Sequence, residues 1–538
     1  MRRRRSPAYR GSLTVFLCLL LTLIFGVIGA CLEYSRAQAV SCQAQLAANA
    51  AAESIFAGYH APLHARYQLL GRLIPGADFG ELEEETLHYV AGCSGQRTSL
   101  LGHGGLVSYQ EEEASWSEVS FLTDQNGAIF TYQAAKAILY SGVDILTDEW
   151  AERLGLTGGE TESAYRENSE KENVSAAEFL SGYADWSEEL QQAQEEAEAK
   201  AREADAQEAA EAAVTSEEGE ATETAAAENA NQKALEEERA KGKHFLDMVN
   251  DLKELAGRGV LGLVLPEGKN VSAGQITSGN LPSELSSSMK SRCVGESVSG
   301  GNGLLFREYL MRNLDCFTSD TDKPIAYELE YVIAGKKTDQ ANLEAVLSKI
   351  LLMRTALNLT YLSRSPAKQA EVAEAAALAV GWTGNPAIVE VTSKVFLAAW
   401  ALAEGAYDVR HLLAGKKVEL MKTDAGWHLQ FANLLEEMTE SAVDMDDNAE
   451  EQGLSYEDYL RILLYLTGTE TAAYRGMDVV QWNIARIDSA FVLSDCMVSG
   501  SLTIQVSTQA IFSPLYGSLG RVGQANLEKQ SAFSYISS

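Results

Sequence analysis

The chain is 538 residues long, which allows about two to four domains with sizeable hydrophobic cores. Hydrophobic residues make up 46% and charged residues 22% of it, a globular composition that excludes disorder throughout. The formal net charge of −33 argues against a nucleic-acid-binding protein, because an acidic surface repels phosphates. The charge is unevenly distributed: Arg2, Arg3, Arg4, Arg5 and Arg10 precede the first apolar run, and Glu33 is the first acidic residue.

The first predicted element is the apolar segment at residues 13–32, LTVFLCLLLTLIFGVIGACL, which contains no charged residue. At a rise of about 1.5 Å per residue, a helix of this length spans roughly 30 Å, the hydrocarbon thickness of a bilayer. The arginines lie on its N-terminal side. The positive-inside rule therefore predicts a cytoplasmic tail at residues 1–12, a single transmembrane helix and an extracellular bulk.

Two other interpretations of this segment remain open. A cleavable signal peptide has the same basic start, but its apolar region is usually about 7–15 residues long. In a lipoprotein, Cys31 would be acylated, since Ile28-Gly29-Ala30-Cys31 resembles a lipobox. The length of the apolar run favours a retained helix.

The membrane helix is expected to continue outward as a stalk over residues 33–60. Alanine is the best helix former and dominates residues 37–57, where there is no glycine or proline. Gly58 and Pro62 then predict the end of the helix. Within the membrane, Thr22, Gly26 and Ala30 form a row of small residues that suits close packing against another helix, although chance in a Gly- and Ala-rich segment is an equal alternative.

The exported part is expected to have an α+β fold with a largely helical middle. Short strands are predicted around residues 119–121, 325–333 and 502–506 from alternating apolar side chains. Helices are predicted over residues 130–140 and 343–361, from an N-cap and proline at Asn385-Pro386, and from a capping box at residues 455–458. The phrase Ala-Gly-Lys-Lys, at residues 334–337 and 414–417, is expected to mark a turn after a regular element.

Composition divides the exported part into four segments. Residues 187–241 hold 17 acidic and 5 basic residues with few aliphatic anchors, which predicts an insertion that is either disordered or a solvated helix. The other segments are an α+β region at 61–186, a strand with a helical block at 242–440, and helices followed by strands at 441–538.

No catalytic, cofactor-binding or metal site is predicted. His60 and His64 have the spacing of helical metal ligands, but Pro62 between them is expected to spoil the helix. Residues 102–105 (GHGG) lack a nucleophile elbow, and Gly335-Lys336 and Gly415-Lys416 are not followed by Ser or Thr as in a phosphate loop. The seven cysteines do not form a disulfide pattern, although pairing of Cys293 with Cys316 and a link between two copies through Cys42 remain open.

Specific stretches of the sequence resemble two known groups of proteins. Residues 11–16 (GSLTVF), the apolar run and residues 32–38 (LEYSRAQ) resemble the N-terminal segment of TadE/TadG-type Tad (Flp) pilus-assembly proteins. Phe16 stands where such proteins usually carry a glutamate, so the resemblance does not extend to prepilin processing or pilin-style polymerisation. Other stretches resemble the domain-of-unknown-function 5702 family of Gram-positive bacteria: 51–59 (AAESIFAGY), 328–336 (ELEYVIAGK), 399–404 (AWALAE) and 408–416 (DVRHLLAGK).

These resemblances imply a non-enzymatic membrane protein with no cofactor, whose partners are the membrane and pilin-like or secretion-platform membrane proteins. It would serve as an accessory or minor structural component of a Tad-like pilus or secretion apparatus. One alternative is a surface binding protein anchored by a lipid on Cys31. A second alternative is an exported hydrolase whose catalytic acids or histidines are too far apart in sequence to form a recognisable motif.

Overall fold

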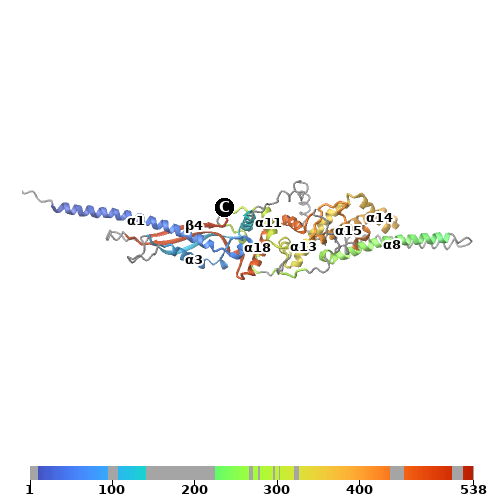
Figure 1. The fold of residues 1–538 in the computed structure, drawn as a ribbon, viewed down its shortest axis with the longest axis horizontal. Helices are drawn as coiled ribbons and strands as arrows, with labels where there is room; N and C mark the ends of the chain where they lie inside the picture. The colour runs from blue at the N-terminus through green and yellow to red at the C-terminus, as the bar shows by residue number, and fades with distance from the viewer. Residues whose placement is uncertain are drawn as a thin grey trace, which may run out of the picture. The chain divides into compact units, whose positions relative to one another are not determined.

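Figure 1 shows the fold in a computed structural model, which describes residues 10–94, 107–140, 224–265, 271–276, 279–294, 297–301, 303–319, 326–436, 453–511 and 525–536. The chain divides into two compact units, each assembled from separated stretches. The first unit comprises residues 1–143, 278–309 and 469–538, and the second comprises 144–277 and 310–468. Helices combine with one antiparallel sheet, which confirms the predicted α+β class.

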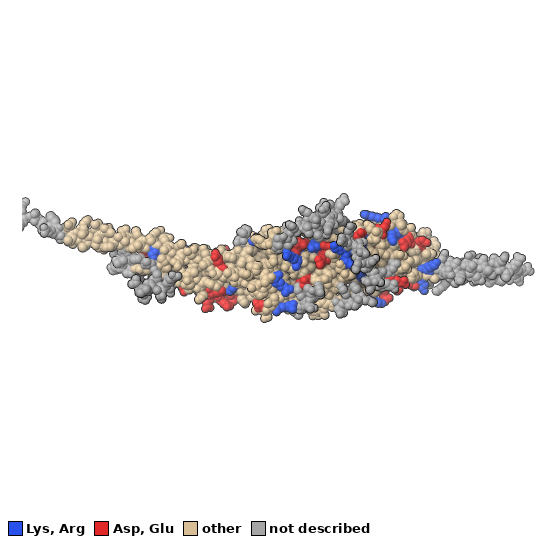
Figure 2. Space-filling model, viewed as in Figure 1, with Lys and Arg blue, Asp and Glu red and all other residues tan. Residues whose placement is uncertain are grey.

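The first unit is built on α1 (Arg10–Ala57), one continuous helix of 48 residues. Side chains in its N-terminal part, from residue 13 to residue 32, are nearly all exposed, and this part protrudes beyond the sheet (Figure 1). In Figure 2 the protruding part carries no coloured charge over its apolar length. The predicted long apolar helix and its end before Gly58 are therefore confirmed, and α1 has the length and apolarity of a membrane anchor.

Two further helices, α13 (Asp339–Leu362) and α15 (Pro386–Leu413), are also long and apolar enough to cross a membrane. In each of them 44% of the most apolar window is buried inside the protein, compared with 6% in α1. They also bury Arg354 and Asp408, and charged side chains are costly in hydrocarbon. We therefore assign α13 and α15 to the core of the second unit.

A four-stranded antiparallel sheet packs on the C-terminal half of α1. Its central strand, β3 (Cys496–Thr508), pairs with β2 (Gln110–Phe121), β4 (Ala525–Ser534) and the short β1 (Arg72–Leu73). The predicted alternation is confirmed in β3, where Leu502, Ile504 and Val506 are fully buried. These side chains form the floor of the core beneath α1.

The core between helix and sheet combines small residues with large ones. The helix contributes a buried alanine face: Ala44, Ala47, Ala48, Ala51 and Ala52. Small side chains allow the helix backbone to approach the sheet closely, and the sheet fills the space with Trp116, Phe121 and Met497. At the end of the helix, the ring of Phe56 stacks on Phe533 at a centroid distance of 4.5 Å. The alanine stretch is therefore both a helix former and a packing surface.

Short helices and two longer ones, α4 and α18, complete the first unit together with α3. They are α2 (Ala61–Tyr67), η1 (Pro75–Ala77), α3 (Phe79–Gly92), η2 (Gln125–Gly127), α4 (Ala128–Tyr140), η3 (Pro282–Glu284), α10 (Ser287–Lys290), α18 (Thr469–Ala485) and η6 (Leu493–Asp495). The boundary with the second unit, after Tyr309, falls within α11 (Gly303–Asn313). The predicted strand at residues 119–121, the turn after it and the helix from residue 130 correspond to β2, η2 and α4.

His60 caps α2, and the prediction that Pro62 spoils the helix is wrong. Proline is tolerated in the first helical turn, because the missing N–H has no partner there. His60 Nδ1 accepts a hydrogen bond from the Leu63 N–H at 3.2 Å, and Nε2 lies 3.3 Å from Asp488 Oδ2. His60 therefore has a structural role at the start of α2.

The regular elements of the second unit are all helices in the described residues, apart from isolated bridges at Gln275–Thr338 and Val418–Leu454. Around α13 and α15 lie α8 (Thr224–Gly257), α9 (Val260–Val264), α12 (Glu328–Ala334), α14 (Pro366–Val380), η4 (Gly381–Thr383), η5 (Phe431–Asn433) and α17 (Tyr456–Leu466). Residues 224–241 of the predicted acidic insertion are helical within α8, whereas residues 187–223 lie outside the described residues, as do residues 1–9 and 102–105.

The strand predicted at residues 325–333 is wrong, because residues 328–333 form α12. Glutamates alternate with apolar residues there, but every side chain from Glu328 to Ile333 is buried. Glu328 accepts the Asp315 N–H and Glu330 accepts the Phe317 N–H, each at 2.9 Å. The alternation in polarity therefore reflects buried acceptors for a neighbouring loop and not a solvent-facing side of a strand.

The predicted helix starts at Asn385 and Ser455 are confirmed. Asn385 caps α15 by accepting the Ala387 N–H, and Ser455 forms a capping box with Asp458 at the start of α17. Both Ala-Gly-Lys-Lys phrases follow a helix, α12 and α15, and their glycines, Gly335 and Gly415, adopt positive φ angles of 67° and 82°. Glycine favours this conformation, which ends the helix.

Candidate functional site

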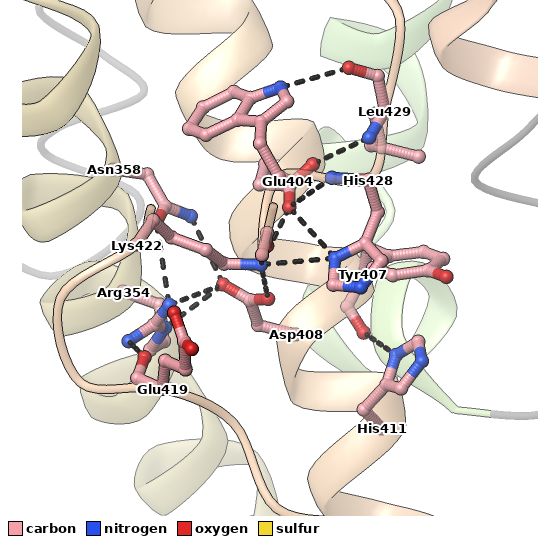
Figure 3. A network of polar contacts seen from close by, with 12 residues as sticks. Arg354, Asn358, Glu404, Tyr407, Asp408, His411, Glu419, Lys422, His428 and Leu429 are labelled. Carbon is pink, nitrogen blue, oxygen red and sulfur yellow. Dashed lines mark hydrogen bonds and ion pairs between the residues drawn. The ribbon is translucent and has the colours of Figure 1, made fainter. Parts of the chain in front are cut away.

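Ionisable side chains of the second unit gather in a buried charge network, which we define as Arg354, Glu404, Asp408, Lys422 and His428 (Figure 3). Three chain segments supply it. Arg354 comes from α13, Glu404 and Asp408 come from α15, and Lys422 and His428 come from the loop after α15, residues 414–430. The network therefore joins two core helices to a loop.

Helical spacing aligns the network. Glu404 and Asp408 are four residues apart and so lie on one face of α15, which meets Arg354 on α13. Between the two acids, Gly405 lets the helices approach: a Cβ at this position would lie 3.0 Å from Thr355 Oγ1. The close contact brings the side chains within ion-pairing distance.

Arg354 is fully buried, and each nitrogen of its guanidinium group donates a hydrogen bond to at least one acceptor. Its Nε and Nη2 donate to Asp408 Oδ2 at 2.9 and 2.8 Å. Its Nη1 donates to the carbonyl oxygens of Glu419 and Leu420 at 2.8 and 2.9 Å, and also contacts the Tyr459 hydroxyl. Burial disfavours the charge on Arg354, but the Asp408 carboxylate more than offsets this and raises the pKa of Arg354. Arg354 therefore stays cationic and ties the loop to α13.

Lys422 is buried at the centre of the network. Its Nζ lies 2.7 Å from Glu404 Oε1, 2.7 Å from Asp408 Oδ1, 2.7 Å from the Gly426 carbonyl oxygen and 3.2 Å from His428 Nδ1. Burial tends to raise the pKa of Asp408, but Arg354 and Lys422 outweigh it and hold that pKa below its usual range. Two bases therefore balance two acids inside the protein.

Glu404 also orders the loop backbone. Its Oε1 accepts the His428 N–H at 3.1 Å and its Oε2 accepts the Leu429 N–H at 2.9 Å. The carboxylate thus satisfies backbone donors that would otherwise be buried without partners.

The donor set of Glu404, Asp408 and His428 could hold a metal ion by its composition and spacing. However, the Lys422 ammonium lies within 3.2 Å of an atom of each of these residues, where such an ion would bind. A second cation cannot share that position without strong repulsion. In this arrangement Lys422 provides the positive charge, and the network is best explained as a structural element.

Two histidines lie at the edge of the network. The His428 side chain is 40% exposed, and its ring stacks with that of His411 at a centroid distance of 5.8 Å. Burial lowers the pKa of His411, and its Nδ1 lies 2.8 Å from the Tyr407 carbonyl oxygen. Burial and the neighbouring bases favour a neutral His411.

A further buried acid, Glu330 on α12, has no basic partner among the described residues. Its Oε1 accepts hydrogen bonds from the Phe317 N–H and from the Tyr456 hydroxyl at 2.9 and 2.8 Å, whereas its Oε2 has no hydrogen-bond partner among the described residues. Burial raises the pKa of Glu330 to about 7. This carboxyl is therefore protonated over much of the range in which surface glutamates are charged.

The residues singled out from the sequence lie elsewhere, on the exposed part of α1. Thr22, Gly26 and Ala30 follow at intervals of four and so share one helix face, and the Thr22 hydroxyl donates to the Cys18 carbonyl at 2.7 Å. Cys31 is exposed in the middle of the same helix, and all seven cysteines are free thiols, so a Cys293–Cys316 bond is not formed.

Sequence analysis missed the buried charge network. A signal was present: Glu404 and Asp408 interrupt an otherwise apolar stretch of α15, and charged residues are rarely buried without partners. Their partners Arg354 and Lys422 are 50 and 18 residues away from Glu404 in sequence, so the linear pattern could not identify them.

We expect Lys422→Met to destabilise the second unit by about 3–5 kcal/mol, because Glu404 and Asp408 would be left with one buried base. Urea unfolding of the full-length chain in detergent, followed by tryptophan fluorescence, measures this. The matched control is Lys394→Met on α15, where the ion pair with Glu390 is exposed, and it should change stability by less than about 0.5 kcal/mol. Adding Glu404→Gln to Lys422→Met should recover part of the loss, whereas additive losses would contradict the role of charge balance.

We expect Glu330→Gln to become progressively stabilising relative to the parent as the pH rises from about 4.5 to 7. The unfolded chain loses the Glu330 proton near pH 4.5 and the folded chain near pH 7, so the parent loses stability across this window, up to about 3 kcal/mol in total. The glutamine keeps the oxygen that accepts both hydrogen bonds. Urea unfolding of parent and variant at several pH values measures the difference, and a difference independent of pH would contradict the raised pKa.

The buried charge network and Glu330 both lie within the region that matches a known family. A model of the Family of unknown function (DUF5702) matches residues 236–508, which is half of the chain. No curated protein and no solved structure matches the chain. The chain belongs to the family of unknown function DUF5702.

Proposed function

We propose that the protein is an exported, non-enzymatic membrane protein that acts as an accessory or minor structural component of a Tad-like pilus or secretion apparatus. The observation that carries this proposal is the division of α1 into two parts. Residues 13–32 are apolar and exposed, and the continuation of the same helix packs under the sheet of the first unit. Such a helix anchors a folded domain directly to a membrane.

The orientation follows from charge. Arginines at positions 2–5 and 10 precede the apolar segment, and Glu33 follows it. By the positive-inside rule, the chain after residue 32, in both compact units, lies outside the cell. The strong acidity of the exported part suits a solvated domain and argues against binding to anionic polymers.

A structural role is favoured by the state of the buried ionisable groups. Arg354, Asp408 and Lys422 are at most 6% exposed and neutralise one another, so they are poorly placed to meet a substrate. Contact with the apparatus is assigned to the membrane helix: residues 11–38 resemble TadE/TadG-type proteins, and the face bearing Thr22, Gly26 and Ala30 would pack against pilin-like or platform helices.

Native cysteines provide a test of topology. Cys42 is exposed on α1 beyond the apolar segment, whereas Cys31 lies within it. A membrane-impermeant maleimide applied to intact cells should label Cys42 but not Cys31, as read by peptide mass spectrometry, and labelling of Cys42 only after cell lysis would overturn the orientation. The intact mass in the same sample should retain residues 1–30; a mature chain that starts at an acylated Cys31 would instead support the lipid-anchored alternative.

Photocrosslinking tests the assignment to an apparatus. A photoreactive residue at Leu23, beside the small-residue face, should yield adducts with pilin-like or secretion-platform proteins in the native host. The matched control is Ile28, which is about 200° around the helix from Gly26 and faces the opposite side. Equal adducts at both positions, or adducts with lipid alone at both, would contradict specific packing of this face.

A further inference from the structure

The first turn of α1 beyond the apolar segment is fastened to the end of the central strand. Arg36 is buried, and its Nη2 donates to Thr508 Oγ1 at 2.8 Å. Glu33 Oε2 accepts the Ile511 N–H at 3.1 Å. Glu33 and Arg36 also pair with each other at 2.7 Å. The C-terminal end of β3 is therefore held beside residues 33–36 of the helix.

This attachment fixes the height of the strand end above the apolar segment. Since α1 is continuous, Glu33 and Arg36 lie about 1.5 and 6 Å beyond residue 32 along the helix axis. The headgroup layer on each side of a bilayer is roughly 5–8 Å thick. Residues 33–36 and the groups that they bind therefore fall within that layer once residues 13–32 span the hydrocarbon.

Two exposed side chains near residues 33–36 are of types that suit a membrane–water interface. Tyr34 is 68% exposed and Ile511 is 43% exposed. Tyrosine is enriched at membrane interfaces because its ring is apolar and its hydroxyl is polar. The Glu33 and Arg36 charges offset each other, so this end of the unit brings no net charge from that pair into the layer.

We propose that the end of β3 at Thr508 and the three residues after it, 509–511, rest in the headgroup layer of the outer leaflet, with Tyr34 and Ile511 in contact with lipid. This inference rests on the proposed anchoring through α1. The partner of this end of the sheet is then the lipid surface, because residues 33–36, to which it is attached, directly follow the membrane-spanning part of α1.

The experiment places the full-length chain in phosphatidylcholine nanodiscs that contain a trace of phosphatidylcholine with a diazirine near the headgroup. After irradiation, the adducts are mapped by peptide mass spectrometry. We expect adducts at Tyr34 and Ile511. A second lipid with the diazirine at the acyl end should label residues within 13–32.

Ile487 is the matched control. It is 61% exposed, more than Ile511, and it belongs to the same unit. Its neighbour Asp488 contacts His60, just past the end of α1, which is roughly 40 Å of helix beyond residue 32. Ile487 should therefore receive no adduct from either lipid.

The outcomes separate the two proposals. Adducts within residues 13–32, with Ile511 no more labelled than Ile487, would overturn the seating of the sheet and leave the anchoring intact. Absence of adducts within residues 13–32 would overturn the anchoring itself. Five- to tenfold more headgroup-probe adduct at Ile511 than at Ile487 would support the seating.

Discussion

The first unit depends on one constraint: a single helix must satisfy two environments along its length. In hydrocarbon, a helix is stable because its backbone hydrogen bonds are internal, and every face can be apolar. Beyond residue 32 the same helix needs only one apolar face, and its alanines supply one that is narrow enough for the sheet to approach. Because the helix is continuous, the sheet lies at a fixed distance along it from the apolar segment. Glu33 and Arg36 are the first side chains to be fastened to the sheet, and they are also the first charges after the apolar run.

In the second unit, a long loop at residues 414–430 packs against two apolar helices, α13 and α15. Apolar contacts alone do not satisfy the buried N–H and C=O groups of a loop. Here Glu404 accepts backbone N–H groups of His428 and Leu429, and Arg354 donates to the carbonyls of Glu419 and Leu420. The buried charges of Glu404 and Arg354 need partners of opposite sign. Lys422 pairs with Glu404, and Asp408 pairs with Arg354. Glu404 and Asp408 come from stretches that also carry the family resemblance, 399–404 and 408–416.

Local signals in the sequence were sufficient to predict elements whose stabilisation is local. The long helix, the caps at Asn385 and Ser455, and the glycine turns at Gly335 and Gly415 depend on residues within a few positions of one another, and each was predicted. Prediction failed where distant residues decide the structure. The alternation around Glu330 looked like a strand because the loop residues that its carboxyl binds were not visible in the pattern. The charge network was missed for the same reason, since Lys422 and Arg354 reach α15 from separate segments. Two apolar helices also illustrate the limit of composition: α13 and α15 could span a membrane by length, and only their buried charges and packing identify them as core.

Two buried acids in the second unit, Asp408 and Glu330, respond to pH in opposite ways, because Asp408 has basic partners and Glu330 has none among the described residues. The pKa of Asp408 is lowered by Arg354 and Lys422, so its contribution to stability is present above its unfolded pKa of 3.8 and is lost as the pH falls below that value. The pKa of Glu330 is raised by burial, so its contribution is fully present below its unfolded pKa of 4.5 and declines as the pH rises toward about 7. Both contributions are therefore largest together near pH 4 to 4.5.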